Sequence, residues 1–177
     1  MGYGLVSRLF HWITVVLVLV MVPVGLVMVQ EIPPSVQNPL FMLHKGLGPF
    51  VLVVVLLRLG WRAFHPAPPL PADLPAAQRF AASAVHVGLY VLLLVMAVSG
   101  YVRVTTGGFP IEALQAIGIP PLFSKDEAVA AVAKRVHATA IVGLLALIAL
   151  HVGAAAYHGL VRRDGIVSRM WPPFGPR

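Results

Sequence analysis

Cysteine is absent from the sequence, and charged residues are scarce. None of the 177 residues is a cysteine, and only 11% are Asp, Glu, Lys or Arg, less than half of the roughly 25% typical of soluble domains. The lack of thiols excludes disulfides, thiolate-held iron–sulfur clusters, thiolate-ligated haem and covalent c-type haem. The 13 basic residues exceed the 6 acidic ones, for a net charge of +7. So few charges do not build a nucleic-acid-binding patch, and we expect no nucleic-acid partner.

Apolar residues dominate what remains. They make up 59% of the chain, and the mean hydropathy is +0.89, too high for a soluble domain of this size to bury in one core. The composition predicts an integral membrane protein with the lipid bilayer as its surroundings. The length allows about four membrane helices and leaves no room for a separate soluble domain. We therefore expect one membrane-integral domain over residues 1–177.

Four continuous apolar runs predict the membrane helices. Each is long enough to cross a hydrocarbon layer of ~30 Å, and none alternates as a β-barrel strand does. The first run is too long for a signal-peptide core and lacks a cleavage site, so we expect it to stay in place. The fold class is therefore an all-α, four-helix transmembrane bundle. The predicted spans are residues 9–29, 40–64, 80–104 and 132–157.

The connecting segments predict the orientation of the bundle. Residues 65–78 hold five prolines and are expected to be extended, whereas residues 111–118 are expected to form a short interfacial helix in the longest loop. With the N-terminus inside, eight arginines and two aspartates give the inner side +6, and the outer side carries +1. The positive-inside rule then places both termini in the cytoplasm.

The histidines form two layers across the predicted bundle. His137 and His151 are 14 residues apart on the fourth span, which is close to four helical turns or ~21 Å, so they project from nearly one face. His44 lies at the level of His137, and His11 at the level of His151. Ionisable residues at membrane depth indicate function. The spacing therefore predicts two bis-histidine sites, one near each membrane face.

Haem suits two opposed imidazoles on different helices, because they can take the axial positions of a porphyrin iron. Zinc suits them less, since the residues offer no tetrahedral ligand set. Several glycines lie near the two levels and leave room for a flat ring, although glycines also serve plain helix packing: Gly25, Gly46, Gly48 and Gly100. The cations expected beside the propionates are Arg8 and Arg79 at the inner face and Lys45, Arg103, Lys134 and Arg135 at the outer face.

Alternatives stay open for the remaining polar and aromatic residues. A histidine at a span end is often only an interfacial residue. His86 is an alternative inner ligand, a quinone contact or a packing residue. His158, seven residues after His151, either contacts a quinone head group or lies among the lipid headgroups. His65 is expected to be solvated, and the three tryptophans are expected to act as interfacial anchors.

Several motifs together resemble the bacterial cytochrome b561 family over essentially the whole chain. The motifs are RLFHW at residues 8–12, LHKGLG at 43–48, RLGWR at 58–62 before the proline-rich loop, Val85-His86 with Gly88, Ser99-Gly100-Tyr101, and the histidines 137, 151 and 158. The resemblance implies a four-helix cytochrome with two haem b groups. It implies that His11 and His151 bind the inner haem, and that His44 and His137 bind the outer one.

The resemblance also implies electron transfer across the membrane. Some similar proteins oxidise superoxide at the periplasmic face and reduce ubiquinone. Lys45, Arg103, Lys134 and Arg135 are then the residues expected to attract superoxide, with the quinone near His158, Arg79 or His86. A second hypothesis is a cytochrome b subunit that links a partner dehydrogenase or hydrogenase to quinone. A third is a small transporter or channel whose histidines relay protons.

Overall fold

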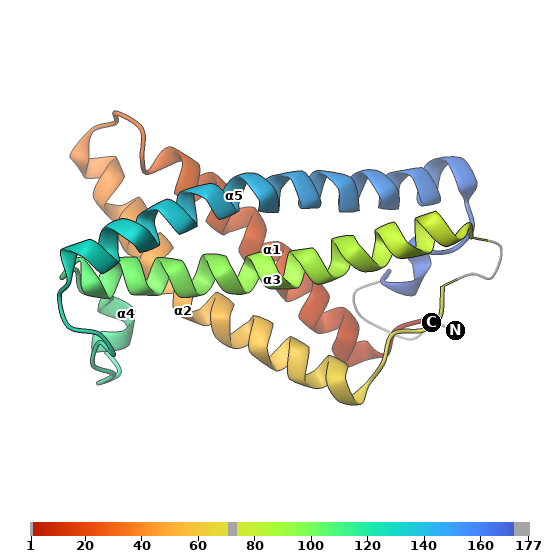
Figure 1. Ribbon diagram of the computed structural model, residues 1–177, viewed down its shortest axis with the longest axis horizontal. Helices are drawn as coiled ribbons and strands as arrows, with labels where there is room; N and C mark the ends of the chain where they lie inside the picture. The colour runs from red at the N-terminus through yellow and green to blue at the C-terminus, as the bar shows by residue number, and fades with distance from the viewer. Residues whose placement is uncertain (1, 71–73, 172–177) are drawn as a thin grey trace.

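The computed structural model describes residues 2–70 and 74–171, and this part of the chain is helical without a strand. The long helices run alongside one another in a bundle (Figure 1). They confirm the predicted four-helix membrane bundle, since all four are long and apolar enough to span a bilayer. The helices are α1 (Leu5–Val27), α2 (Pro34–Phe64), α3 (Ala76–Thr106), the short α4 (Glu112–Gln115) and α5 (Glu127–Ala156), followed by a π-helical segment (Tyr157–Arg162) and a 3-10 turn (Val167–Arg169).

Each long helix begins before its apolar run, because apolarity marks only the part that meets hydrocarbon. Helix α2 begins at Pro34, since proline suits the first helical turn, where its missing N–H has no partner to lose. Helix α5 begins at Glu127, after Asp126 has capped it by accepting a hydrogen bond from the Val129 N–H at 3.1 Å. The predicted interfacial helix at residues 111–118 is present as the shorter α4.

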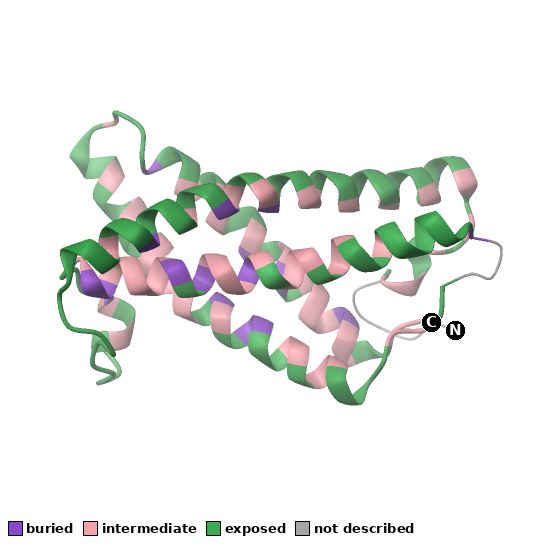
Figure 2. Ribbon diagram, in the orientation of Figure 1, coloured by how far each residue is buried: buried purple, intermediate pink, exposed green. Residues whose placement is uncertain are grey.

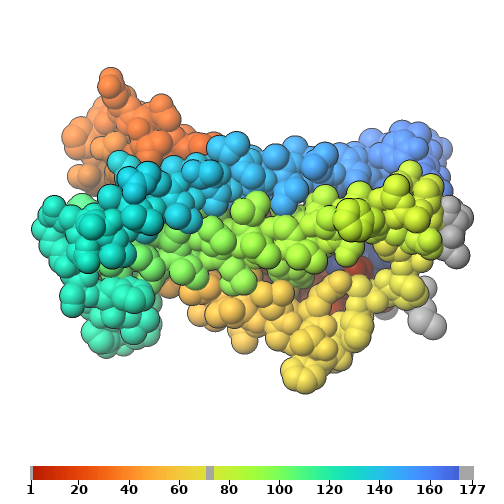
Figure 3. All heavy atoms as spheres, viewed as in Figure 1, coloured from red at the N-terminus to blue at the C-terminus, as the bar shows by residue number. Residues whose placement is uncertain are grey.

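The four long helices do not pack equally. Helix α3 lies along α5, whereas α1 packs on α2 and α2 on α3; Figure 3 shows the α3 and α5 side chains in contact along one face. A Cβ added at Gly88 of α3 would lie 2.6 Å from Leu147 Cδ1 of α5, so a small residue is what allows this close approach. The buried core cluster consists of Leu17, Val51, Val54, Val55, Leu93 and Leu144.

The outward faces of the helices are apolar and exposed. Figure 2 shows exposed residues along the outside of every long helix, with the buried ones turned toward the bundle. Leu19, for example, is 67% exposed in the middle of α1. In water such a surface would drive aggregation, whereas in a bilayer it meets lipid chains of equal polarity. The burial pattern therefore agrees with a multi-pass membrane protein.

Both ends of the described chain lie at one end of the bundle, which we call the inner end (Figure 1). The Tyr3 N–H donates to the Arg169 carbonyl at 3.2 Å, and Trp12 Nε1 donates to the Met170 carbonyl at 3.0 Å. The ring of Trp12 also meets that of Trp171 edge to face, with centroids 5.4 Å apart. The opposite end, which we call the outer end, holds the connection containing α4.

We predict that Leu144→Ala destabilises the bundle by about 2 kcal/mol, because it opens a cavity at a side chain that is 2% exposed. Leu150→Ala on the same helix is the matched control, since this side chain is 60% exposed to the lipid side and should change stability by less than about 0.5 kcal/mol. Thermal unfolding in detergent measures both. Equal losses would contradict the placement of the core.

Candidate functional site

The outer histidine pair consists of His44 on α2 and His137 on α5. The ring centroids of His44 and His137 lie 6.3 Å apart, and their planes are inclined by 83°. A metal–imidazole bond is about 2.0 Å long, so two opposed bonds and the two ring radii add to about this separation. The pair therefore has the spacing of two axial ligands of one iron.

The hydrogen bonds of His137 leave one of its ring nitrogens available for a metal. His137 Nδ1 lies 3.0 Å from the Met96 carbonyl and 3.1 Å from Ser99 Oγ, both on α3. Because Ser99 Oγ donates its own proton to the Val95 carbonyl, both neighbours of Nδ1 are acceptors, and Nδ1 must carry a proton. The neutral ring then has its lone pair on Nε2. Metal-binding histidines are commonly held in this way.

His44 carries a buried polar atom that the described residues do not fully satisfy. Its Nδ1 is buried and makes no hydrogen bond of full geometry in the described part of the chain, although the Met21 backbone of α1 lies within reach of the ring. Two glycines leave the space that the outer rings occupy. A Cβ at Gly25 would lie 2.8 Å from His44 Cε1, and one at Gly100 would lie 3.1 Å from His137 Cε1.

Three histidines meet at the inner level. The His11 and His151 rings have centroids 6.2 Å apart, almost the outer spacing, whereas His86 and His151 are 5.3 Å apart. The helices that carry these pairs also differ in how closely they pack. Among the described helices α5 packs along α3, which carries His86, but makes few close approaches to α1 and α2. The two pairs with the longer ring separation thus stand on helices that approach each other less closely than α3 and α5 do.

Arg58 is an inner-level residue that the sequence reasoning did not single out. Its Nη2 lies 3.2 Å from His11 Nδ1, and its Cζ lies 5.1 Å from the centre of the Tyr90 ring. The available signal was its spacing, since Arg58 follows His44 by 14 residues, as His151 follows His137. That spacing puts Arg58 on the histidine face of α2, ~21 Å deeper than His44.

The four outer cations differ in their contacts and in their exposure. Lys45 donates to Glu112 at 2.7 Å and to the Pro110 carbonyl at 2.8 Å, which fastens α4 to α2. The hydrogen bond from Lys45 lowers the pKa of Glu112, so this carboxyl stays ionised. Lys134 and Arg135 are exposed, just before His137, and Arg103 is half-buried close enough for its charge to reach both outer rings.

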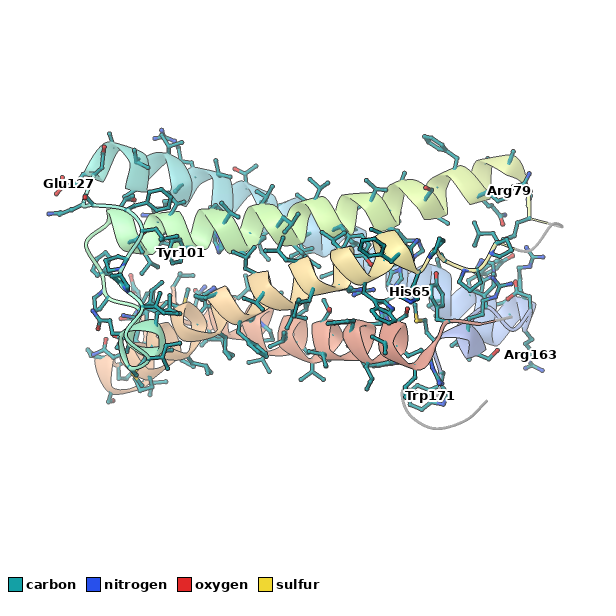
Figure 4. The ribbon with its side chains drawn as sticks, turned by 90° about the horizontal axis from the view of Figure 1, so that it is seen from below. His65, Arg79, Tyr101, Glu127, Arg163 and Trp171 are labelled. Atoms are coloured by element: carbon teal, nitrogen blue, oxygen red, sulfur yellow. The ribbon has the colours of Figure 1, made fainter. Side chains whose placement is uncertain are left out.

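The two inner cations, Arg8 and Arg79, differ in burial. Arg8 is buried, at 4% exposure, in the first turns of α1. Arg79 is exposed near the start of α3, and Figure 4 places it at the same end as His65, Arg163 and Trp171, opposite Tyr101 and Glu127. His65 is exposed, as expected, and stacks on Trp61 at 3.6 Å. The structure thus brings Arg8 into the bundle and leaves Arg79 on its surface.

His158 is paired at the inner end. Its Nδ1 lies 2.6 Å from Asp164 Oδ2, in a turn where Asp164 Oδ1 also accepts from the Ile166 N–H and Arg162 lies 3.4 Å away. Burial alone would raise the pKa of Asp164, but the bonds from His158 and Ile166 and the charge of Arg162 together lower it. An ionised Asp164 therefore holds one nitrogen of His158 and leaves the other available.

The donor set suits a porphyrin iron better than a bare metal ion. Within residues 2–70 and 74–171, no group of three His, Asp or Glu side chains is arranged to hold a metal. A porphyrin supplies four ligands itself and needs only two opposed imidazoles. The spacing of both pairs, the Nε2 lone pair of His137 and the incompletely satisfied nitrogen of His44 all fit this group.

Comparison with known proteins gives the same result. Residues 2–173 match the prokaryotic cytochrome b561 family. The chain is 31% identical to cytochrome b561 homolog 2 of Escherichia coli (strain K12) over 170 residues, which cover 95% of this chain and 90% of that protein. It is also 31% identical to cytochrome b561 homolog 1 of the same organism, over 73% of each chain. The chain belongs to the prokaryotic cytochrome b561 family, whose members are membrane b-type cytochromes that bind haem b and transfer electrons.

Proposed function

We propose that the chain holds two haem b groups and carries electrons between the two faces of the bacterial inner membrane. His44 with His137 would bind the outer haem, and His11 with His151 the inner one. The main support is that both pairs show nearly the same ring separation, 6.3 and 6.2 Å, at opposite levels of the bundle. Bound haem supplies one-electron redox chemistry, while the protein sets its ligation and surroundings.

His86 is not a ligand in this proposal. Its ring is only 5.3 Å from that of His151, which leaves too little room for an iron bonded to both. Helices α3 and α5 also pack closely there, with the Cβ position of Gly88 only 2.6 Å from Leu147. A porphyrin between these two helices would have to separate them. We assign His86 to the wall of the inner site.

We propose that the inner end faces the cytoplasm. The arginines assigned to this end outnumber its aspartates eight to two in the sequence, and basic residues are retained on the cytoplasmic side. The described ends of the chain meet at this end, through Tyr3 and Arg169. The outer histidine pair would then lie near the periplasm.

Superoxide is the proposed donor at the outer end. Lys134, Arg135 and Arg103 provide positive charge near the outer histidines, and such a field raises the encounter rate of a small anion. Lys45 contributes less than the sequence suggested, because Glu112 balances its charge at 2.7 Å. The overall reaction balances when two superoxide ions and one quinone with two protons give two dioxygen molecules and one quinol.

Ubiquinone is the proposed acceptor at the inner end, beside His158. Asp164 holds Nδ1 of His158, so Nε2 of the neutral ring is left to accept a hydrogen bond from the hydroxyl of the quinol product. Protons for quinol formation are then taken from the cytoplasmic side. His86 is half-buried deeper in the bundle and Arg79 is exposed, which makes them weaker choices than His158 for this contact.

We predict that the purified protein shows b-type bands in a reduced-minus-oxidised spectrum, with about two haems per chain. His44→Ala or His137→Ala should remove mainly the outer haem, and His11→Ala or His151→Ala mainly the inner one. His86→Ala is the matched control and should retain both, although its ring contacts His151 as His11 does. Loss of haem in the His86 variant alone would reverse the inner assignment, and retention of both haems in all four ligand variants would refute the pairing.

We predict that Lys134→Gln with Arg135→Gln slows reduction by superoxide, and that the slowing is larger at low ionic strength, where charges are screened less. Each neutralised charge should lower the rate severalfold at low salt, within the range known for electrostatic steering. Lys125→Gln with Glu127→Gln is the control, because this exposed pair at 3.1 Å loses one charge of each sign. Stopped-flow haem absorbance measures the rates, and an unchanged rate and salt dependence would exclude steering.

The alternative of a docking subunit makes a different prediction. A chain that only accepts electrons from a partner dehydrogenase or hydrogenase should lack donor activity of its own. We expect the protein purified without a partner to reduce ubiquinone in the presence of superoxide. Absence of this activity in protein with full haem content would favour the docking role.

A further inference from the structure

Arg58 places a positive charge inside the membrane span of α2, where it contacts no carboxylate of residues 2–70 and 74–171. Its described contacts are His11 Nδ1 at 3.2 Å and the Tyr90 ring at 5.1 Å. The acidic residues of the described chain all lie at helix ends or in loops, and none of them forms an ion pair with Arg58: Glu31, Glu112, Asp126, Glu127 and Asp164. An arginine at this depth normally pairs with a counter-charge. The position therefore calls for an anion.

The hydrogen bond to His11 is incompatible with iron binding by that ring. A guanidinium can only donate, so His11 Nδ1 accepts, and a neutral ring then carries its proton on Nε2. Both nitrogens are thus in use, one as an acceptor and one as a protonated donor. His137 shows the opposite arrangement, with the proton on Nδ1. For His11 to bind an iron, Arg58 has to release it.

We propose that Arg58 is the binding residue for a propionate of the inner haem. The inference rests on the two-haem function proposed above. The carboxylate that the porphyrin carries gives Arg58 the anion it lacks and frees His11 in the same event, and an arginine–carboxylate pair of this kind is strong and directional. The sequence suggested Arg8 and Arg79 for this role; Arg8 is buried in the first turns of α1, and Arg79 is exposed near the start of α3. Arg58 instead lies on the histidine face of α2, 14 residues from His44.

The charge on Arg58 has a redox consequence. A cation beside a haem favours the reduced iron, which has one positive charge fewer than the oxidised iron. Its pairing with the propionate also removes a negative charge that would favour the oxidised iron. Removing Arg58 should therefore lower the midpoint potential of the inner haem and leave the outer haem, ~21 Å away by the helical rise, almost unchanged.

The test uses the purified holoprotein with Arg58→Gln, Arg58→Lys and the control Arg62→Gln, which removes an equal charge one turn further along α2. Redox titration followed by haem absorbance measures both midpoints. We expect Arg58→Gln to favour the oxidised inner haem at least tenfold, which is about 59 mV for a one-electron couple. Arg58→Lys should shift the midpoint potential of the inner haem less, because lysine keeps the charge but cannot make the two-pronged contact of a guanidinium. Arg62→Gln should shift it least.

A second measurement identifies the propionate itself. Haem-depleted protein is titrated with haem b or with its dimethyl ester, in which both propionates are uncharged, and the inner-site bands are followed. The unsubstituted chain should bind haem b at least tenfold more tightly than the ester, whereas Arg58→Gln should bind the two about equally. If the glutamine variant does not take up inner haem, Arg58→Lys serves instead and should show a reduced preference for haem b over the ester.

The outcomes separate the two proposals. Unchanged midpoint potentials, or a full preference for haem b over the ester in the Arg58 variants, would overturn the role of Arg58 while leaving the two-haem function intact. Retention of both haems in His11→Ala and His151→Ala would instead overturn the proposed inner site. An equal loss of potential in Arg62→Gln would show a general charge effect and would also overturn the propionate assignment.

Discussion

A polar side chain within a hydrocarbon layer has no water to bind, so each must find a partner inside the bundle. His137 meets this constraint through hydrogen bonds with α3, and Arg58 meets it through His11 and the Tyr90 ring. The lipid-facing surfaces meet it by having few polar groups to satisfy. Among the described helices α5 packs most closely on α3, and the proposed ligand pairs join α5 to α1 and α2, which it approaches least.

Helix α3 supports the proposed sites without supplying a proposed ligand. It packs along α5 and fixes the tautomer of His137 through Met96 and Ser99. Gly100 gives the ring of His137 its space, and Gly88 allows the close approach of Leu147. A helix in direct contact with α5 can orient the α5 histidines, but it leaves no room for a porphyrin on that side. Support and ligation are therefore assigned to different neighbours of α5.

The sequence was sufficient to predict the spans and the grouping of His44 with His137 and of His11 with His151, because helical rise and residue spacing set both. It left His86 open between an inner ligand, a quinone contact and a packing residue, because its 5.3 Å ring separation from His151 depends on how closely two helices pack. The ion pair between Lys45 and Glu112 depends on the path of the loop that carries Glu112, which residue spacing does not specify. Arg58 was counted only as an inner charge, because its spacing from His44 gains meaning only once the facing side chains are known.

The Lys45–Glu112 ion pair has a mechanical consequence for the outer histidines. Lys45 is the residue after His44 on α2, and Glu112 lies in the segment that leads from α3 to α5, the helix of His137. The pair thus ties the connection between α3 and α5 to α2, one residue after His44. The position of α4 beside the outer histidine therefore depends in part on an ion pair at the end of the bundle.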